Sequence, residues 1–393
     1  MPFFQLDGFM AASLGFALGL IAFEALRRHV IDKHYADIVI TIISIGFIAL
    51  IDAASLLAMT CLAAAVFTVT RLKLFEASKL GLVAFFIVAS LIALKSLSSA
   101  SPDNPLLLVG LSYYYFRLGS FVIEAGRGNK VYTEASLRAF ATWVFFFPLF
   151  LAGPIQRFHQ LERQPVQDEH LPAIYLKIGF WLVVKIVIAD ALIMAMVLTP
   201  IRGDLIATMA AATPLTGALI FAAHGVLSLV HGYLDLLAYT QIAIGGGALF
   251  GYTVMPNFNR PLLATNITEF WRRWHISLSS WARDYVYFPL YLKTRIPAFA
   301  TYATMLTIGL WHAFNLNWVI WALAHGTAIV AHGRLKQTAL LRSLAADQRT
   351  TYLLTVVSWA TTILFVGCVY NLVAFPGNYE RSWQLLAALS GFG

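Results

Sequence analysis

Charged residues are scarce in this chain: Lys, Arg, Asp and Glu together make up 12% of its 393 residues. Soluble domains carry about 25% charged residues, so the chain lacks the charge needed to cover a water-facing surface of this size. Hydrophobic residues reach 60%, and the mean hydropathy is +0.75. The composition excludes secreted, fibrous and disordered classes and predicts an all-α integral membrane protein.

Cysteine is also scarce. Cys61 and Cys368 each lie in an apolar stretch, and they show no paired spacing. A disulfide framework or a zinc site needs several cysteines or histidines at regular intervals. We therefore predict neither a disulfide framework nor a metal site. As a separate expectation, no cofactor is bound.

The basic residues that give the chain its net charge of +8 fall in short clusters between apolar stretches. This distribution is typical of membrane-surface loops, and it does not form the basic, aromatic-rich face of a nucleic-acid-binding protein. Arg27 and Arg28 follow the first apolar stretch directly. The positive-inside rule then predicts an extracytoplasmic N-terminus in the cell membrane, plasma or inner, with the first stretch retained as a helix and not cleaved as a signal peptide.

Eleven apolar stretches are candidates for membrane helices, and several are too short to cross a bilayer, which takes about 20 residues. Residues 38–69 are too long for one helix and carry Asp52 near the middle, so we predict two helices there. We expect about ten or eleven membrane helices, with one or two re-entrant or interfacial pieces, in one domain spanning 1–393. The stretches are 8–26, 38–69, 81–94, 105–122, 140–151, 173–198, 205–230, 233–250, 285–292, 298–331 and 352–375.

The segment PNFNRPLLATNITEFWRRWHISLSSWARDYVYFPL, residues 256–290, combines tryptophan with clustered cations. Such a mixture suits a membrane interface, where rings lie at headgroup level and charges face water. Four of its charged residues lie close together in the sequence and at an interface would contact lipid headgroups or one another; they are Arg272, Arg273, Arg283 and Asp284. The interfacial interpretation does not account for His275, within the same run.

The stretch 298–331 contains GLWHAFNLNWVIWALAHG and would measure about 51 Å as one helix, against about 30 Å for a membrane core. Asn315 and Asn317 are the natural break. His312 would then lie at the end of one half, where an ionisable residue is a functional candidate. A hydrogen bond to a neighbouring helix is the alternative role for this histidine, and His325 is more ambiguous still.

These motifs together resemble a known family. FWRRWHISLSSWARDYVYFPL, followed by GLWH 37 residues after its histidine, is similar to the signature of the membrane-bound O-acyltransferases. The likeness is to the bacterial branch that contains the alginate O-acetyltransferase and the teichoic-acid D-alanyltransferase. It covers roughly 110–330, through GLSYYYFRL at 110–118, FFFPLFLAGPIQRF at 145–158 and HGYLDLLAYTQIAIGGGALFGYTVMPNFNRP at 231–261.

The resemblance implies a catalytic His312, a second active-site histidine at His275, and helices tilted around a central funnel with a channel for the acyl donor. A histidine kept neutral in an apolar channel can take the proton of an attacking hydroxyl, so we expect a buried His312 to act as general base. Further candidates for binding substrate or donor are Trp311, Asn315, Asp235 and Arg157. The cluster of Arg272, Arg273, Arg283 and Asp284 is a candidate for the donor's phosphate or for an acidic carrier surface. Lipid-headgroup contact or ion pairing is the alternative role for that cluster and for Arg157.

The expected donor is a cytoplasmic thioester, carried on the phosphopantetheine of an acyl-carrier protein or on CoA. The expected acceptor is a cell-envelope polysaccharide or glycopolymer, reached directly or through an extracytoplasmic transferase; membrane lipid is the other partner, and nucleic acid is not. The acyl group stays open between acetyl and D-alanyl, because YLKTRIPA follows YFPL and HGYLD replaces an SGYSD-like segment. A small-substrate transporter and an inactive scaffold are the competing interpretations.

Overall fold

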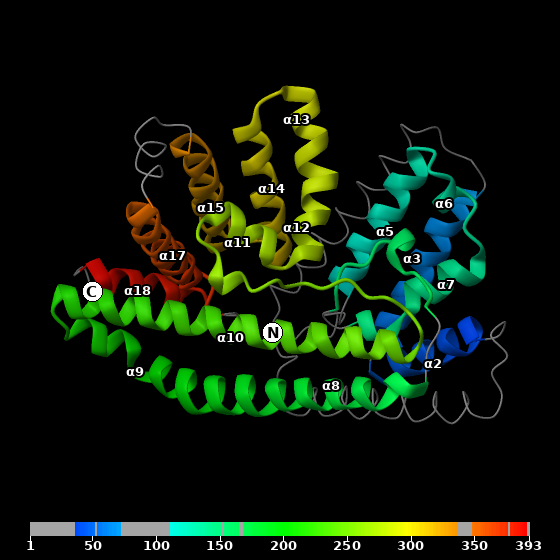
Figure 1. Cartoon of the computed structure of the whole chain (residues 1–393), viewed down its shortest axis with the longest axis horizontal. Helices are drawn as coiled ribbons and strands as arrows, with labels where there is room; N and C mark the ends of the chain where they lie inside the picture. Colours follow the sequence, from blue (N-terminus) through cyan, green and yellow to red (C-terminus); the bar gives the residue numbers. More distant parts are fainter. Residues whose placement is uncertain are drawn as a thin grey trace. The chain divides into compact units, whose positions relative to one another are not determined.

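A computed structural model describes residues 36–51, 53–71, 111–150, 153–164, 168–336, 348–375 and 378–390. Within these ranges every named element is helical, and the only pairing of strand type is an isolated bridge between Arg163 and Tyr252 (Figure 1). The all-α prediction is confirmed. The candidate spans 8–26 and 81–94, and the N-terminus whose orientation was predicted, lie outside the described residues.

Three described helices are long and apolar enough to cross a membrane: Leu171–Ala210, Pro214–Leu249 and Tyr352–Tyr370. The first is a continuous run of α8 (Leu171–Val183), the π-helical η5 (Val184–Leu198) and α9 (Thr199–Ala210). The second is α10 (Pro214–Leu249), and the third lies in α17 (Gln348–Tyr370).

The predicted spans 205–230 and 233–250 are wrong in their boundaries. The chain turns at residues 211–213, and α10 then continues unbroken through residues 231 and 232. Gly232 is accommodated there because it packs against Tyr370, whose hydroxyl would lie 2.7 Å from a Cβ at this position. The glycine thus serves a close helix contact and does not end the helix.

Two predicted breaks are confirmed. In the stretch 38–69, α2 (Ala36–Ile51) ends and α3 (Ala53–Arg71) begins on either side of residue 52, which is itself not described. In the stretch 298–331, α14 (Pro297–His312) and α15 (Leu316–Leu335) are separated by residues 313–315. Of the two asparagines predicted at that break, Asn315 lies in it and Asn317 lies within α15.

The chain folds as two compact units: Met1–Gly179 with Tyr239–Met255, and Phe180–Ala238 with Pro256–Gly393. The prediction of one domain therefore stays a prediction, as do the total number of membrane helices and the central funnel. In the first unit, α5 (Leu111–Gly126), α6 (Lys130–Thr133) and α7 (Leu137–Phe145) pack through aromatic rings. Phe121 is the centre of that core, with ring centres 4.8–5.7 Å away at Tyr132, Phe140, Trp143 and Phe158.

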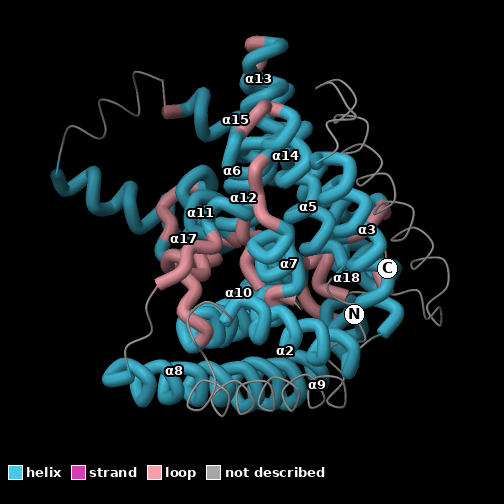
Figure 2. Tube along the Cα trace, turned by 90° about the vertical axis from the view of Figure 1, so that its right-hand side faces the viewer, coloured by secondary structure: helices cyan, strands magenta, loops and turns pink. Residues whose placement is uncertain are grey.

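The second unit holds a series of short helices: α11 (Ile267–Arg273), α12 (Ile276–Ala282), η7 (Arg283–Tyr287) and α13 (Phe288–Thr294), and it ends with α18 (Glu380–Ser390). Helices α14 and α15 lie side by side, as Figures 1 and 2 show. Glycine permits their close approach, because a Cβ at Gly309 would lie 2.6 Å from the carbonyl oxygen of Trp318, and one at Gly326 would lie 2.7 Å from the ring of Tyr302. This tight pair of helices positions His312 and the aromatic rings around it.

Candidate active site

His312 is the last residue of α14, and its ring stacks on Trp318 of α15, with ring centres 4.2 Å apart and planes 10° from parallel. The turn between the two helices produces this contact. Asn315 caps α15, because its side-chain oxygen accepts a hydrogen bond of 3.1 Å from the backbone N–H of Trp318. Asn315 was predicted to bind substrate. In the structure its cap fixes the start of α15 and so positions Trp318 against the ring of His312.

Trp311 lies between the two predicted histidines. Its ring centre is 4.4 Å from that of His312 and 6.3 Å from that of His275, which meets it edge to face. His275 comes from the turn between α11 and α12, so residues 37 positions apart share one indole ring. Three of the predicted site residues are therefore brought together. His275 is buried, whereas His312 is only half-buried, which corrects the prediction of a buried base.

His275 adopts the left-handed backbone conformation, with φ 44° and ψ 56°, which costs a non-glycine residue energy unless its surroundings hold it there. Asn257, fully buried, does so. Its carbonyl oxygen accepts from Ile276 N–H at 2.8 Å, and its side-chain oxygen accepts from the N–H and the hydroxyl of Ser277 at 3.2 and 2.6 Å. Asn257 therefore caps α12 in place of His275. Our sequence reasoning missed it, although it lies in the NFNRP segment quoted for the resemblance.

Burial lowers the pKa of His275, which lies outside the three helices long enough to span a membrane, to about 4. The imidazole is therefore neutral near pH 7. A neutral ring offers one N–H donor and one acceptor, which suits it to orient a hydroxyl or to donate to a developing oxyanion.

A third histidine extends the same aromatic cluster. His325 accepts a 3.3 Å hydrogen bond from the indole N–H of Trp271, and its ring lies 4.5 Å from Trp321. Trp321 in turn contacts Trp318, with ring centres 5.2 Å apart. Sequence reasoning left His325 ambiguous and did not single out Trp318 or Trp321; their recurrence every three or four residues on α15 was the available signal.

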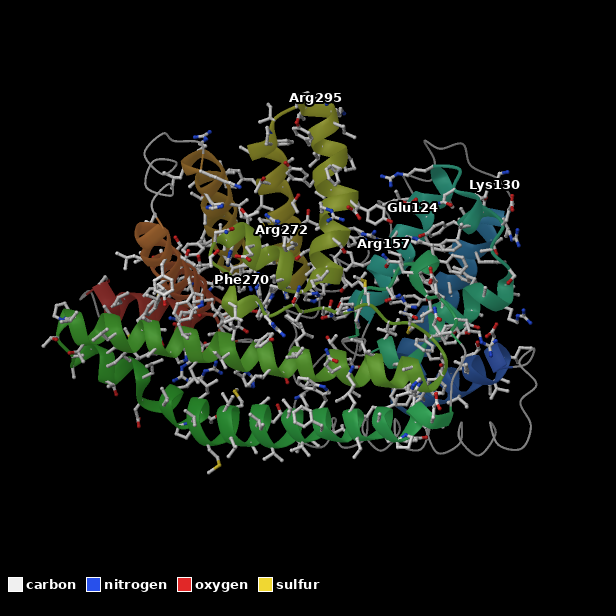
Figure 3. The ribbon with its side chains drawn as sticks, viewed as in Figure 1. Glu124, Lys130, Arg157, Phe270, Arg272 and Arg295 are labelled. Atoms are coloured by element: carbon white, nitrogen blue, oxygen red, sulfur yellow. The ribbon has the colours of Figure 1, made fainter. Side chains whose placement is uncertain are left out.

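Of the three arginines predicted as candidates in residues 256–290, one is exposed and two form ion pairs. Arg272 is exposed on α11 near Phe270 (Figure 3), and Arg273 pairs with Glu269 one turn earlier. Arg283 pairs with its neighbour Asp284 at 2.7 Å. The ion-pair interpretation thus describes Arg273, Arg283 and Asp284. Because each pair joins residues one or four positions apart, neither pair ties this segment to the histidines.

Asp235 belongs to a different cluster. Its Oδ1 lies 2.6 Å from the ammonium of Lys185, which is almost fully buried and which also pairs with Asp190 at 2.6 Å. Lys185 and Asp190 are five residues apart on the π-helical η5, where the i→i+5 hydrogen-bond pattern puts such residues on one face. We call this group the lysine cluster: Lys185, Asp190 and Asp235.

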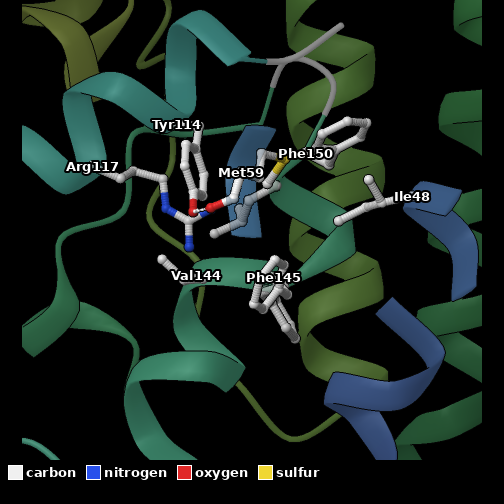
Figure 4. Close-up of a pocket in the computed structure, with 9 residues that line it drawn as sticks. Ile48, Met59, Tyr114, Arg117, Val144, Phe145 and Phe150 are labelled. Carbon is white, nitrogen blue, oxygen red and sulfur yellow. Dashed lines mark hydrogen bonds between the residues drawn. The ribbon is translucent and has the colours of Figure 1, made fainter. Parts of the chain in front are cut away.

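Arg157 lies in the first unit, where its backbone N–H donates to the side chain of Gln160 at 3.0 Å and begins a short 3-10 helix, Phe158–Gln160. The first unit also contains a narrow pocket (Figure 4). Buried Arg117 and Tyr114 line it. The hydroxyl of Tyr114 donates to the carbonyl of Met59 at 2.5 Å. The guanidinium carbon of Arg117 lies 4.8 Å from the ring centre of Trp143. None of the predicted site residues lines this pocket.

The model of the membrane-bound O-acyltransferase family matches residues 38–375. A probable alginate O-acetylase of Azotobacter vinelandii is 34% identical over 299 residues, covering 73% of this chain and 54% of that protein. A teichoic acid D-alanyltransferase of Streptococcus thermophilus is 29% identical over 63% of this chain and 62% of its own, and a peptidoglycan O-acetyltransferase of Helicobacter pylori is 32% identical over 49% and 37%. The chain spans about half the length of the alginate O-acetylases it matches.

Proposed function

The chain belongs to the membrane-bound O-acyltransferase family, and we propose that it moves an acyl group from a thioester to a hydroxyl with His312 as general base. The observation that carries the proposal is that His312 and His275 both lie against the indole ring of Trp311. Stacking on Trp318 restrains the His312 ring by its face, while proton transfer takes place at the ring edge, so the contact orients the imidazole without occupying the atoms that react.

The proposed reaction balances in atoms and protons. His312 takes the proton of the acceptor hydroxyl as its oxygen attacks the thioester carbonyl, and a tetrahedral oxyanion forms. The C–S bond then breaks, the new ester leaves, and the thiolate receives the proton from His312. The base is thereby regenerated, and the products are an ester and a free thiol.

His275 serves this reaction as a neutral hydrogen-bonding group. Buried and fixed by Asn257, it is preorganised, and a preorganised donor stabilises developing charge at little reorganisation cost. In the proposal it orients the acceptor hydroxyl or donates to the oxyanion, across Trp311 from the base.

We propose acetyl as the transferred group. Probable alginate O-acetylases are 32–35% identical to this chain over 73% of its length, whereas teichoic acid D-alanyltransferases are 26–29% identical over 59–63%. The donor is an acetyl thioester on an acyl-carrier protein or on CoA, presented from the cytoplasm. The acceptor is a hydroxyl of an extracytoplasmic cell-envelope polysaccharide, reached directly or through a partner transferase. On this proposal the protein works in the inner membrane.

The proposal is tested with purified protein by following thiol release from acetyl-CoA, acetyl-loaded carrier protein and D-alanyl-loaded carrier protein, with and without a uronate polysaccharide. An acetyl donor should give acceptor-dependent thiol release at least ten times faster than the D-alanyl donor. Faster release from the D-alanyl donor would overturn the choice of acetyl. Absence of acceptor-dependent release from every donor, in protein that is folded and monodisperse, would overturn the transferase proposal itself.

A further inference from the structure

Two arginines from different helices lie against one phenylalanine ring in the second unit. The guanidinium carbons of Arg202, in α9, and Arg381, in α18, lie 5.2 and 5.6 Å from the ring centre of Phe375. A guanidinium nitrogen of Arg381 also donates to the backbone carbonyl of Arg202 at 2.6 Å. We call Arg202, Arg381 and Phe375 the arginine site; its two cations are held close together by the fold.

The side-chain partners of Arg202 are neutral. Its Nε donates to Nε2 of His224 at 3.3 Å, and its Nη2 donates to the hydroxyl of Ser228 at 3.3 Å. Because an arginine N–H only donates, Nε2 of His224 accepts, and the proton of that ring lies on Nδ1, 2.7 Å from the side-chain oxygen of Asn371. The network orients the guanidinium but adds no negative charge.

Neither guanidinium of the arginine site forms an ion pair with a carboxylate in the part of the chain that the structure describes. The acidic residues nearest in sequence, Asp204 and Glu380, are exposed. Buried Lys185, by contrast, has two carboxylates. Two cations held together and half-buried repel each other, so an anion bound between them would be favoured.

The surroundings indicate which anion. Arg202 lies near the end of the apolar helix Leu171–Ala210, and the residues that precede it include large apolar side chains with 41–67% of their surface exposed: Leu192, Met196, Val197 and Ile201. Beside the arginine site, α9 and α18 share a buried cluster with Leu205, Phe221 and Leu385. A charged site at the end of an exposed apolar strip matches a molecule with an anionic head and an apolar tail.

We propose that the arginine site binds the phosphate of an anionic glycerophospholipid, with an acyl chain along the apolar strip of α9 and η5. The two non-bridging oxygens of a phosphodiester match the planar donor fork of arginine, and basic pockets between membrane helices bind anionic headgroups. This site is separate from the proposed catalytic residues and does not depend on the acetyltransferase proposal.

The test uses the delipidated full chain in a non-ionic detergent and measures its melting temperature as lipid is added. Phosphatidylglycerol should raise the Tm of the wild-type protein by about 3–8 °C, because a ligand that binds only the folded state stabilises it. The double variant Arg202→Gln/Arg381→Gln should lose most of this rise. The matched control Arg334→Gln removes an exposed arginine at the end of α15 and should keep the full rise.

Two further arms identify the source of the phosphate. Phosphatidylcholine, which has the phosphodiester but no net charge, should give less than half the rise, and inorganic phosphate at the same concentration should give none. An equal rise with phosphatidylcholine or with inorganic phosphate would overturn the anionic lipid, and a full rise in the double variant would overturn the site. If that variant gives no melting transition, Arg381→Lys replaces it. This change keeps the positive charge but removes the planar donor pair of the guanidinium. Native mass spectrometry should then detect less retained phosphatidylglycerol than in the wild type. Equal retention would overturn the proposal.

Discussion

His312 and Asp235 are both ionisable residues in apolar helical surroundings, but they differ in their contacts: Asp235 forms an ion pair, whereas His312 packs against aromatic rings. Asp235 meets the buried ammonium of Lys185 at 2.6 Å, and Asp190 neutralises the same ammonium from η5. The ring of His312 instead stacks on Trp318 and makes a tilted contact with the ring of Trp311. The carboxylate of Asp235 shares a buried ammonium and holds helices together. The stack on Trp318 instead fixes the plane of the His312 imidazole, which in our proposal orients it for proton transfer.

Removing Lys185 should have the largest effect of the changes considered, and the effect should be on folding stability. Lys185→Ala leaves two carboxylates without their buried cation, and breaking a buried ion pair costs about 3–5 kcal/mol. We expect a marked fall in melting temperature, measured by differential scanning fluorimetry, and little folded protein. The matched control, Lys185→Met with Asp190→Asn and Asp235→Asn, removes all three charges and should recover most of the loss. If Lys185→Ala melts like the wild type, the lysine cluster does not hold these helices together.

Replacing the second histidine should lower activity without a comparable effect on folding. His275→Ala removes a preorganised hydrogen-bonding group, and the loss of one such donor costs about 10²–10³ in kcat in well-studied hydrolases. We expect a fall of about 10²-fold in kcat per folded molecule, measured as acceptor-dependent thiol release. His170→Ala, which alters a largely exposed histidine, is the control and should retain wild-type activity. A His275→Ala enzyme within threefold of wild type would remove His275 from the site.

The hydrogen bonds from Ser277 to Asn257, which hold the backbone turn at His275, are tested by a substitution with a smaller expected effect. Asn257→Ala removes the acceptor for the N–H and hydroxyl of Ser277 and frees the left-handed turn, at a cost of about 1–3 kcal/mol in hydrogen bonding. We expect a fall of about tenfold in kcat with KM for the donor unchanged, and partial rescue by Asn257→Asp, which keeps the acceptor oxygen. A merely structural role would lower the yield of folded protein and leave kcat per folded molecule intact.

The smallest effect is expected at the ion pair of Arg283 and Asp284. Pairs on a protein surface contribute about 0.2–1 kcal/mol, so Arg283→Gln should change the unfolding constant by less than about fivefold and leave kcat within about twofold of the wild type. A tenfold rise in the KM for a carrier-protein donor, with CoA as the comparison donor, would instead place Arg283 in a donor-binding surface.

Sequence reasoning was most successful where length alone decides the structure. The stretches 38–69 and 298–331 are too long for one membrane helix, and both break near the polar residues that interrupt them. It was wrong at α10, because the predicted spans 205–230 and 233–250 leave out residues 231 and 232, through which the helix continues. The contact of Gly232 with the hydroxyl of Tyr370 is invisible in the sequence.

The candidate site shows the same division. Trp311 and His312 are adjacent in sequence, and the family resemblance of the two histidine motifs linked His312 to His275. The contact from Asn257 to Ser277 spans 20 residues, and Lys185 meets Asp235 across 50. Such contacts depend on how helices pack, so the pairing of Asp235 with Lys185 could not be foreseen from the sequence. The substrate-binding role of Asp235 stays a prediction.

The most direct test of the central claim is the rate of acyl transfer by His312→Ala, measured on protein whose melting temperature matches that of the wild type. A positioned general base contributes about 10²–10⁴ in rate, so the variant should fall by that factor while donor binding, followed as KM or by titration, stays within about threefold. A transfer rate within threefold of the wild type would contradict the assignment of His312 as the base.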